Sequence, residues 1–252
     1  MLPATLIGCS SKSYFTVDQA RQWGPRVLDG VAGSTEGATG LFCCPSFPLI
    51  PMLLETLGAG GGLVGSQDVS PYPPGAYTGE VSAQVLADLG CRFVMAGHPE
   101  RRRLFGEDDD TVHRKVLATA EAGLAPIIVV GEDVEGASAA DAVSGQFDRW
   151  LDGFPAGGEI LVAYEPAWAI GRPQPAPPEH VAASTLAVRK LVEGRAADPR
   201  VIYGGSAQPG TFRAIRAAAS TDAAVPDGVF MARFGIDPQD FLTVVAEVRG
   251  AG

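Results

Sequence analysis

Eight short apolar runs recur along this chain, and this repeat constrains its fold more than any other feature. Each run is followed by a loop and then by an amphipathic stretch with helical periodicity. Strands that are buried on both faces read as continuous apolar runs, and strands that alternate with helices form parallel sheets. The runs that predict strands are Ala4–Gly8, Gly40–Cys44, Gly62–Gly65, Arg92–Ala96, Pro126–Val130, Ile160–Tyr164, Arg200–Tyr203 and Gly228–Ala232.

Eight such units fit a closed barrel better than an open sheet. An open, doubly wound sheet is the alternative, but Gly8-Cys9-Ser10-Ser11-Lys12 stands after the first run in place of a glycine-rich fingerprint. No linker divides the 252 residues, so we expect one α/β domain over residues 1–252, a (β/α)8 barrel. The predicted helices include Asp18–Leu28, Val81–Leu89, Thr111–Ala122, Ala139–Trp150, Pro178–Val192 and Pro238–Val248.

The formal net charge of −10 bears on the possible partners. Nucleic acids and anionic membranes both require a concentrated basic surface, so we expect neither as a partner. Met1–Ser10 lacks a basic segment followed by a long apolar core, and no run approaches the roughly 18 apolar residues of a membrane span. We therefore expect a soluble, cytoplasmic protein.

The four cysteines, Cys9, Cys43, Cys44 and Cys91, do not have the spacing of a metal site, and the adjacent pair does not suit a simple disulfide framework. Three of them end strand-like runs. We expect them to be small buried hydrophobic residues, and we expect no metal site.

Residues that could take part in catalysis or ligand binding stand where four predicted strands end: Lys12, His98, Glu165 and the Gly204-Gly205-Ser206 turn. Pro166 holds Glu165 extended at the tip of its strand. Taken alone, such a glutamate is more often a surface ion pair, a lone lysine is usually solvated, and a lone histidine is usually structural. Because the carboxyl ends of parallel barrel strands share one rim, the four positions together predict one site.

Five segments, in chain order, resemble motifs of the triosephosphate isomerase family: Gly8–Lys12, Gly75–Glu80, Gly97–Arg102, Tyr164–Gly171 and Ile202–Ser206. The resemblance spans essentially the whole chain, and its most distinctive segments are those of His98 and Glu165. It implies a TIM barrel and an isomerase, an intramolecular oxidoreductase, that needs no cofactor. The implied substrate is a small phosphorylated sugar, and the implied assembly is a homodimer.

By this resemblance, Glu165 moves a proton between two adjacent carbons, and His98 with Lys12 stabilises the enediolate oxygen that forms. Pro99 suits the first position of a short helix, which would place His98 at its positive end and keep the imidazole neutral near pH 7. Glu100 matches a family carboxylate near the site. A salt bridge to Arg101 or Arg102 would explain Glu100 equally well.

The resemblance also implies a phosphate site, built mainly from backbone N–H groups, and a mobile lid over Pro166–Pro175. Ile170 and Ile236 match an apolar pair that would press on the intermediate, although ordinary packing would also explain both. The phosphate site would use Gly171, Gly205, Ser206, Ala232 and Arg233, and the lid and its latch would use Trp168, Tyr203 and Ser206.

Departures from the family pattern lie at the ends of the predicted pocket. Ser10 replaces an asparagine, Pro99 a serine, and Ala232-Arg233 a pair of glycines, while the lid reads Gly171-Arg172-Pro173-Gln174-Pro175. The retained core with altered ends resembles the branch that isomerises four-carbon ketose phosphates, such as erythrulose phosphate, at least as well as the glycolytic enzyme. A non-catalytic protein that binds a phosphorylated metabolite is the alternative.

The segment Gly75–Glu80 resembles the family's interdigitating dimer loop. This implies that Thr78, with Glu80 nearby, reaches into the partner's site beside Lys12 and His98. Association would cover the apolar tip around Tyr72 and Tyr77. The alternative is a proline-stiffened surface loop on a monomer.

Overall fold

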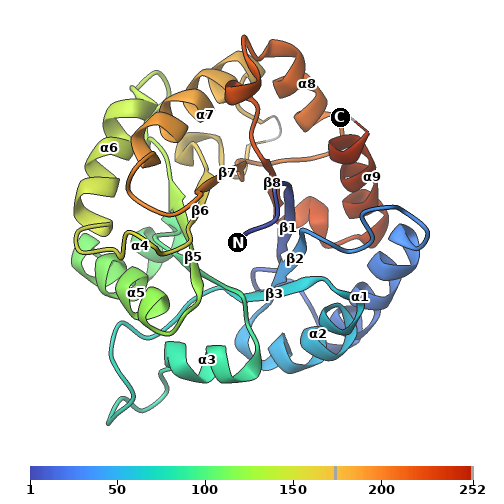
Figure 1. The fold of residues 1–252 in the computed structure, drawn as a ribbon, viewed down its shortest axis with the longest axis vertical. Helices are drawn as coiled ribbons and strands as arrows, with labels where there is room; N and C mark the ends of the chain where they lie inside the picture. Colours follow the sequence, from blue (N-terminus) through green and yellow to red (C-terminus); the bar gives the residue numbers. More distant parts are fainter. Residues whose placement is uncertain (173–174, 251–252) are drawn as a thin grey trace.

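A computed structural model, which describes residues 1–172 and 175–250, contains a closed barrel of eight parallel strands in sequential order (Figure 1). The barrel closes where β1 pairs with β8, with Leu6 opposite Gly228. The expected barrel is thereby confirmed. The strands are β1 (Leu6–Ser10), β2 (Leu41–Cys44), β3 (Leu63–Ser66), β4 (Phe93–Ala96), β5 (Ala125–Val130), β6 (Leu161–Tyr164), β7 (Arg200–Tyr203) and β8 (Gly228–Met231).

A ring of helices surrounds the barrel (Figure 1). Local sequence explains several helix starts: Thr16 and Gln19 form a capping box before α1, and Ser138 caps α6. Pro178 occupies the first turn of α7, where its missing N–H costs nothing. The helices are α1 (Val17–Val31), α2 (Ile50–Thr56), α3 (Ala83–Leu89), α4 (Pro99–Phe105), α5 (Asp109–Glu121), α6 (Ala139–Trp150), α7 (Pro178–Val192), α8 (Thr211–Ala218) and α9 (Pro238–Arg249).

The core has two layers. Inside the barrel, the Phe42 ring packs against Phe93 and Phe230, with centroid distances of 5.1 and 5.2 Å. Gly8 faces this cluster, and a Cβ there would lie 2.1 Å from the Phe42 ring. The second layer lies between barrel and helices and includes the buried Trp23. All four cysteines are free and buried, as expected.

The first predicted strand was placed wrongly, since β1 begins at Leu6 and ends at Ser10. The residues Ala4 and Thr5 lie outside it because the pairing of Leu6 with Gly228 on β8 sets where the strand begins. This displacement matters for the site, because it puts Ser10 inside the strand at the carboxyl-terminal rim.

Candidate functional site

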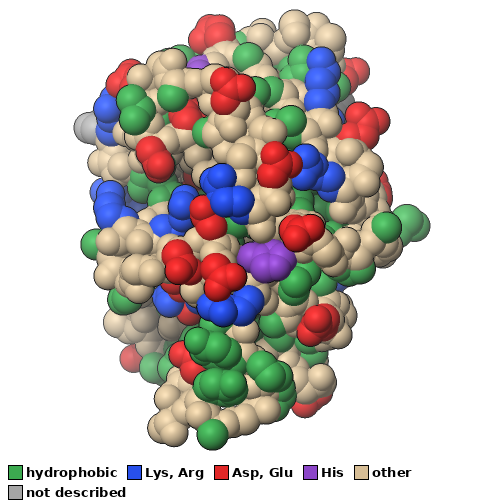
Figure 2. All heavy atoms as spheres, turned by 90° about the vertical axis from the view of Figure 1, so that its left-hand side faces the viewer, with side chains coloured by type: hydrophobic (Ala, Val, Ile, Leu, Met, Phe, Trp, Pro, Cys, Tyr) green, Lys and Arg blue, Asp and Glu red, His purple; other side chains and the backbone are tan. Residues whose placement is uncertain are grey.

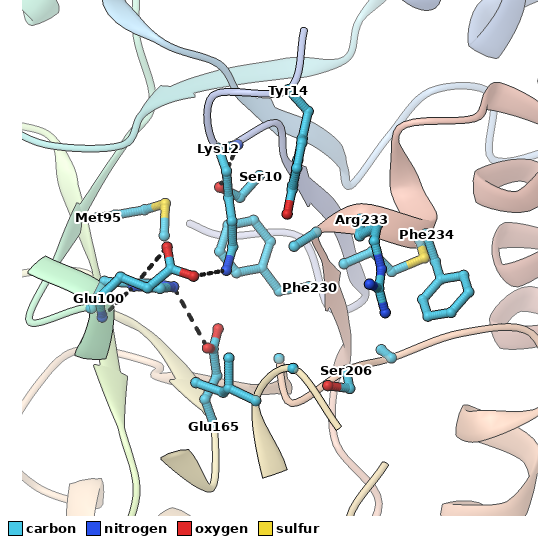
Figure 3. Close-up of a pocket in the computed structure, with 17 residues that line it drawn as sticks. Ser10, Lys12, Tyr14, Met95, Glu100, Glu165, Ser206, Phe230, Arg233 and Phe234 are labelled. Carbon is cyan, nitrogen blue, oxygen red and sulfur yellow. Dashed lines mark hydrogen bonds and ion pairs between the residues drawn. The ribbon is translucent and has the colours of Figure 1, made fainter. Parts of the chain in front are cut away.

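A cavity of about 140 Å³ opens at the carboxyl ends of the strands, and Figure 3 shows the side chains that converge on it. Residues of β1, β4 and β8 line it, together with residues of the segments that follow β1, β4, β6, β7 and β8. The predicted site residues among the lining are Ser10, Lys12, His98, Glu100, Glu165, Ile170, Gly171, Ser206, Ala232 and Arg233.

Glu165 follows β6 directly, and its backbone N–H donates to the carbonyl of Val130 at 2.8 Å. Glu165 is only 6% exposed. Burial raises the pKa of Glu165 to about 8, an effect that Lys12 partly offsets and Glu100 reinforces. Gly204 makes room for the carboxylate, since a Cβ there would lie 2.4 Å from Glu165 Oε1.

His98 is the N-cap of α4, and its Nδ1 accepts a hydrogen bond from the backbone N–H of Glu100 at 3.1 Å. An accepting Nδ1 carries no proton, so the proton of the neutral ring lies on Nε2. Nε2 is 3.8 Å from Glu165 Oε2. Burial, followed by the charge of Lys12, lowers the pKa of His98 to about 4, so the imidazole is neutral at pH 7.

Lys12 and Glu100 form an ion pair at the edge of the cavity. Burial alone would raise the pKa of Glu100, but the hydrogen bond and charge of Lys12 hold it below its usual value. The alternative prediction, a salt bridge from Glu100 to Arg101 or Arg102, was wrong, because Arg101 pairs with Asp68 at 2.8 Å and Arg102 with Asp109 at 3.2 Å. Glu100 therefore orients the cation that faces the cavity.

The first strand ends beside this ion pair. Lys12 has a left-handed backbone, with φ of 44°, and its N–H donates to Ser10 Oγ at 3.4 Å. This bend points Lys12 from β1 into the cavity, next to Tyr14 (Figure 3). Tyr14 escaped the sequence analysis, although it follows the predicted lysine by two residues.

The opposite side of the cavity carries Ser206, Arg233 and Phe234 (Figure 3). Arg233 is exposed, and its guanidinium lies 5.5 Å from the centroid of the Phe234 ring. Within residues 1–172 and 175–250, Arg233 forms no ion pair with an acidic side chain. Its positive charge is therefore available to an anion in the cavity.

Six predicted site residues do not line the cavity: Gly205, Ile236, Trp168, Tyr203, Thr78 and Glu80. Gly205 packs against Tyr203, since a Cβ at this glycine would lie 2.8 Å from Tyr203 Oη. The neighbouring Gly204 lines the cavity instead. Ile236 packs against the hydrophobic layer outside the barrel, whereas Ile170 reaches the cavity. The other lining residues that sequence reasoning missed are Met95, Ala207, Phe230, Met231 and Phe234, which read as ordinary strand or loop residues.

The predicted lid is described up to Arg172 and again from Pro175, and its residues 173 and 174 lie outside the described part of the chain. Trp168 donates from Nε1 to Glu132 at 2.8 Å, and Ser206 Oγ donates to the carbonyl of Ala169 at 3.2 Å. Tyr203 Oη is buried and has no hydrogen-bond partner among the described residues. Ser206 therefore donates a hydrogen bond to the lid, and the latch role of Tyr203 stays a prediction.

The predicted dimer loop projects from the barrel between β3 and α3 (Figure 1). Thr78 and Glu80 are exposed and lie outside the cavity of their own chain. At the lower end of the face in Figure 2, where this loop projects, hydrophobic side chains gather. Within the loop, Tyr72 and Tyr77 stack with centroids 4.4 Å apart and are 39% and 41% exposed.

Two further observations concern metal ligands and thiols. In the described segments, no group of three or more His, Cys, Asp or Glu side chains could hold a metal ion. Burial also raises the pKa of the Cys9 and Cys44 thiols well above the usual value, and such thiols are poor nucleophiles. The cavity itself is lined by the carboxylates of Glu100 and Glu165, the imidazole of His98 and the ammonium group of Lys12.

Comparison with known proteins agrees with this geometry. The family model described as triosephosphate isomerase matches residues 5–248. A triosephosphate isomerase of Nitratidesulfovibrio vulgaris is 38% identical over 81% of this chain and 86% of its own length, and one of Thermus thermophilus is 42% identical over 73% and 78%. An L-erythrulose-1-phosphate isomerase of Pectobacterium atrosepticum is 34% identical over 96% and 94%. The chain belongs to the triosephosphate isomerase family.

Proposed function

We propose that this protein isomerises a small phosphorylated sugar through an enediolate, without a cofactor. The observation that carries the proposal is the convergence of a buried carboxylate, a neutral imidazole and an ammonium group in one cavity. His98 Nε2 lies 3.8 Å from Glu165 Oε2, and Lys12 lines the same cavity. Family membership and relatives named as isomerases of this kind of substrate support it.

The first step removes a proton from the carbon beside the substrate carbonyl. Glu165 accepts this proton, the C–H electron pair becomes a C=C bond, and the carbonyl oxygen takes up negative charge. His98 Nε2–H and Lys12 donate to that oxygen, where the charge develops. Glu165 then returns the proton to the neighbouring carbon, while a proton shift between the two oxygens completes the isomerisation. A pKa of about 8 suits a group that both accepts and returns a proton near neutral pH.

The substrate phosphate lies, in this proposal, at the end of the cavity with Gly171, Ser206, Ala232 and Arg233. The reacting carbons then lie between Glu165 and Lys12. Ser10, a small residue beside Lys12, leaves space for a fourth carbon, so we infer that four-carbon ketose phosphates are accepted as well as trioses. The relative named L-erythrulose-1-phosphate isomerase supports this inference.

A proton-exchange experiment tests the reaction and its substrate together. The protein is incubated in deuterated buffer with dihydroxyacetone phosphate or with L-erythrulose 1-phosphate, and deuterium at the carbon beside the carbonyl is followed by NMR. Isomerisation predicts enzyme-dependent exchange and product formation with at least one of them. Binding of both compounds without any exchange would refute the isomerase and favour a protein that only binds phosphorylated metabolites.

We further propose that the protein is a homodimer of the cytoplasm. A second hollow of about 240 Å³, which Lys12, His98 and Phe105 help to line, lies beside the catalytic cavity. It offers a place for the exposed loop that carries Thr78 and Glu80 of a second copy. No helix in the described segments is long and apolar enough to cross a membrane. Light scattering on an active preparation tests the assembly, and the mass of a monomer would contradict it.

A further inference from the structure

A buried carboxylate outside the catalytic cavity joins the lid to the barrel. Glu132 follows β5 and its side chain is 1% exposed. Its carboxylate accepts from Tyr164 Oη at 3.1 and 3.2 Å, from Trp168 Nε1 at 2.8 Å and from His180 Nε2 at 2.8 Å. An ionised group at this depth requires such donors, because transfer of its charge from water is costly.

The three donors come from separate elements. Tyr164 ends β6, His180 lies in α7, and Trp168 lies in the short helical turn Ala167–Ala169 at the start of the lid. The backbone N–H of Ala167 also donates to the carbonyl of Glu132 at 2.9 Å. Because Trp168 is only two residues before Ile170, which lines the cavity, its position determines where this part of the lid approaches the substrate.

His180 contacts each of the other three side chains in this cluster. Its Nε2 is also 2.9 Å from Tyr164 Oη, and its ring meets the Trp168 ring edge-on with centroids 5.8 Å apart. Its side chain is 28% exposed, so it separates the buried carboxylate from solvent. If it were removed, Glu132 Oε1 would lose a donor, and water entering at that edge would compete with the Trp168 indole.

We propose that His180 is a positioning residue for the isomerase: by donating to Glu132, it holds Trp168 and the start of the lid in the orientation that brings Ile170 and Gly171 to the substrate. This inference rests on the proposed function, since it concerns the lid over that site. The sequence analysis did not single out either Glu132 or His180.

The test compares two substitutions at His180 with a matched control. His180→Ala removes the donor, whereas His180→Gln places an amide N–H near the position of Nε2. His113 is the control, because it is also partly buried but contacts the Trp150 carbonyl, at 3.3 Å and away from the lid. Loss of a hydrogen bond to a buried charge predicts a fall in kcat/KM of roughly 10- to 100-fold for His180→Ala. We expect His180→Gln to stay within about threefold of wild type and His113→Ala to match wild type.

A second measurement reports on the lid without turnover. The emission of Trp168, taken as the difference between each variant and its Trp168→Phe counterpart, is recorded with and without inorganic phosphate. His180→Ala should alter this emission, and His180→Gln should restore it. Wild-type kinetics and emission in His180→Ala would overturn the inference, as would equal impairment of the Ala and Gln variants with intact thermal stability.

If His180→Ala does not fold, His180→Gln is compared with His180→Asn, whose amide is too short to reach Glu132. The inference requires the Asn variant to be the slower of the two, and equal rates would overturn it. Absence of proton exchange in the wild-type protein would instead reject the proposed isomerase. The two failures are therefore distinguishable.

Discussion

Replacing Glu165 by Gln should make the protein more stable and nearly inactive. The carboxyl pKa is about 8 in the folded protein against an ordinary 4.5, with burial as the main cause. The folded state therefore binds this proton more tightly than the unfolded chain does. Stability then falls as the pH rises through about 4.5, and the loss levels off above about 8. A glutamine has the same shape and does not ionise.

The pKa difference gives the size of the effect. At pH 7 the linkage relation predicts that the glutamine variant exceeds wild type by about 3 kcal/mol, and at pH 5 by less than about 1 kcal/mol. Urea unfolding followed by circular dichroism at both pH values, at one protein concentration, measures this. Glu55→Gln, at an exposed position on α2, is the control and should change stability by less than about 0.5 kcal/mol.

Turnover should meanwhile fall by about 10²- to 10⁴-fold, the usual contribution of a general acid–base group. Binding of inorganic phosphate should be preserved, because the amide keeps the shape of the site. A stability difference that is equal at pH 5 and pH 7 would refute the raised pKa. Turnover close to that of wild type would refute the assignment of Glu165 as the base.

Three further predictions follow from the same cavity. The value of kcat/KM should rise about tenfold per pH unit up to about pH 8, because only ionised Glu165 accepts a proton. His98 stays neutral above about pH 4 and adds no further change in this range. A flat profile between pH 6 and 8 would contradict this prediction. Lys12→Ala should lower kcat at least about 100-fold and weaken binding of inorganic phosphate, as titration calorimetry can measure. Arg233→Gly should raise KM, and the fall in kcat/KM should correspond to a loss of roughly 1–3 kcal/mol of transition-state stabilisation. Combined with Ser10→Asn, the same change should shift substrate preference toward three-carbon compounds. An unchanged substrate ratio would show that these two positions do not set the preferred chain length.

The sequence by itself determined the eight-stranded barrel and several of its elements to the residue. The helices over Ala139–Trp150 and Pro178–Val192 were predicted with the bounds that the structure has. The reason is that apolar periodicity and helix caps are local signals. The same locality placed Glu165 at the end of its strand, because the following proline restricts the backbone there.

Only the tertiary structure decided what depends on residues distant in the chain. Pairing with β8 moved the first strand to Leu6–Ser10, and packing put Gly204 rather than Gly205 against the cavity. The pKa of Glu165 is raised by burial that barrel closure creates, and the Glu132 cluster joins three elements that contact one another only in the folded chain. Strand register, burial and charge pairing are properties of such contacts, so no local pattern specifies them.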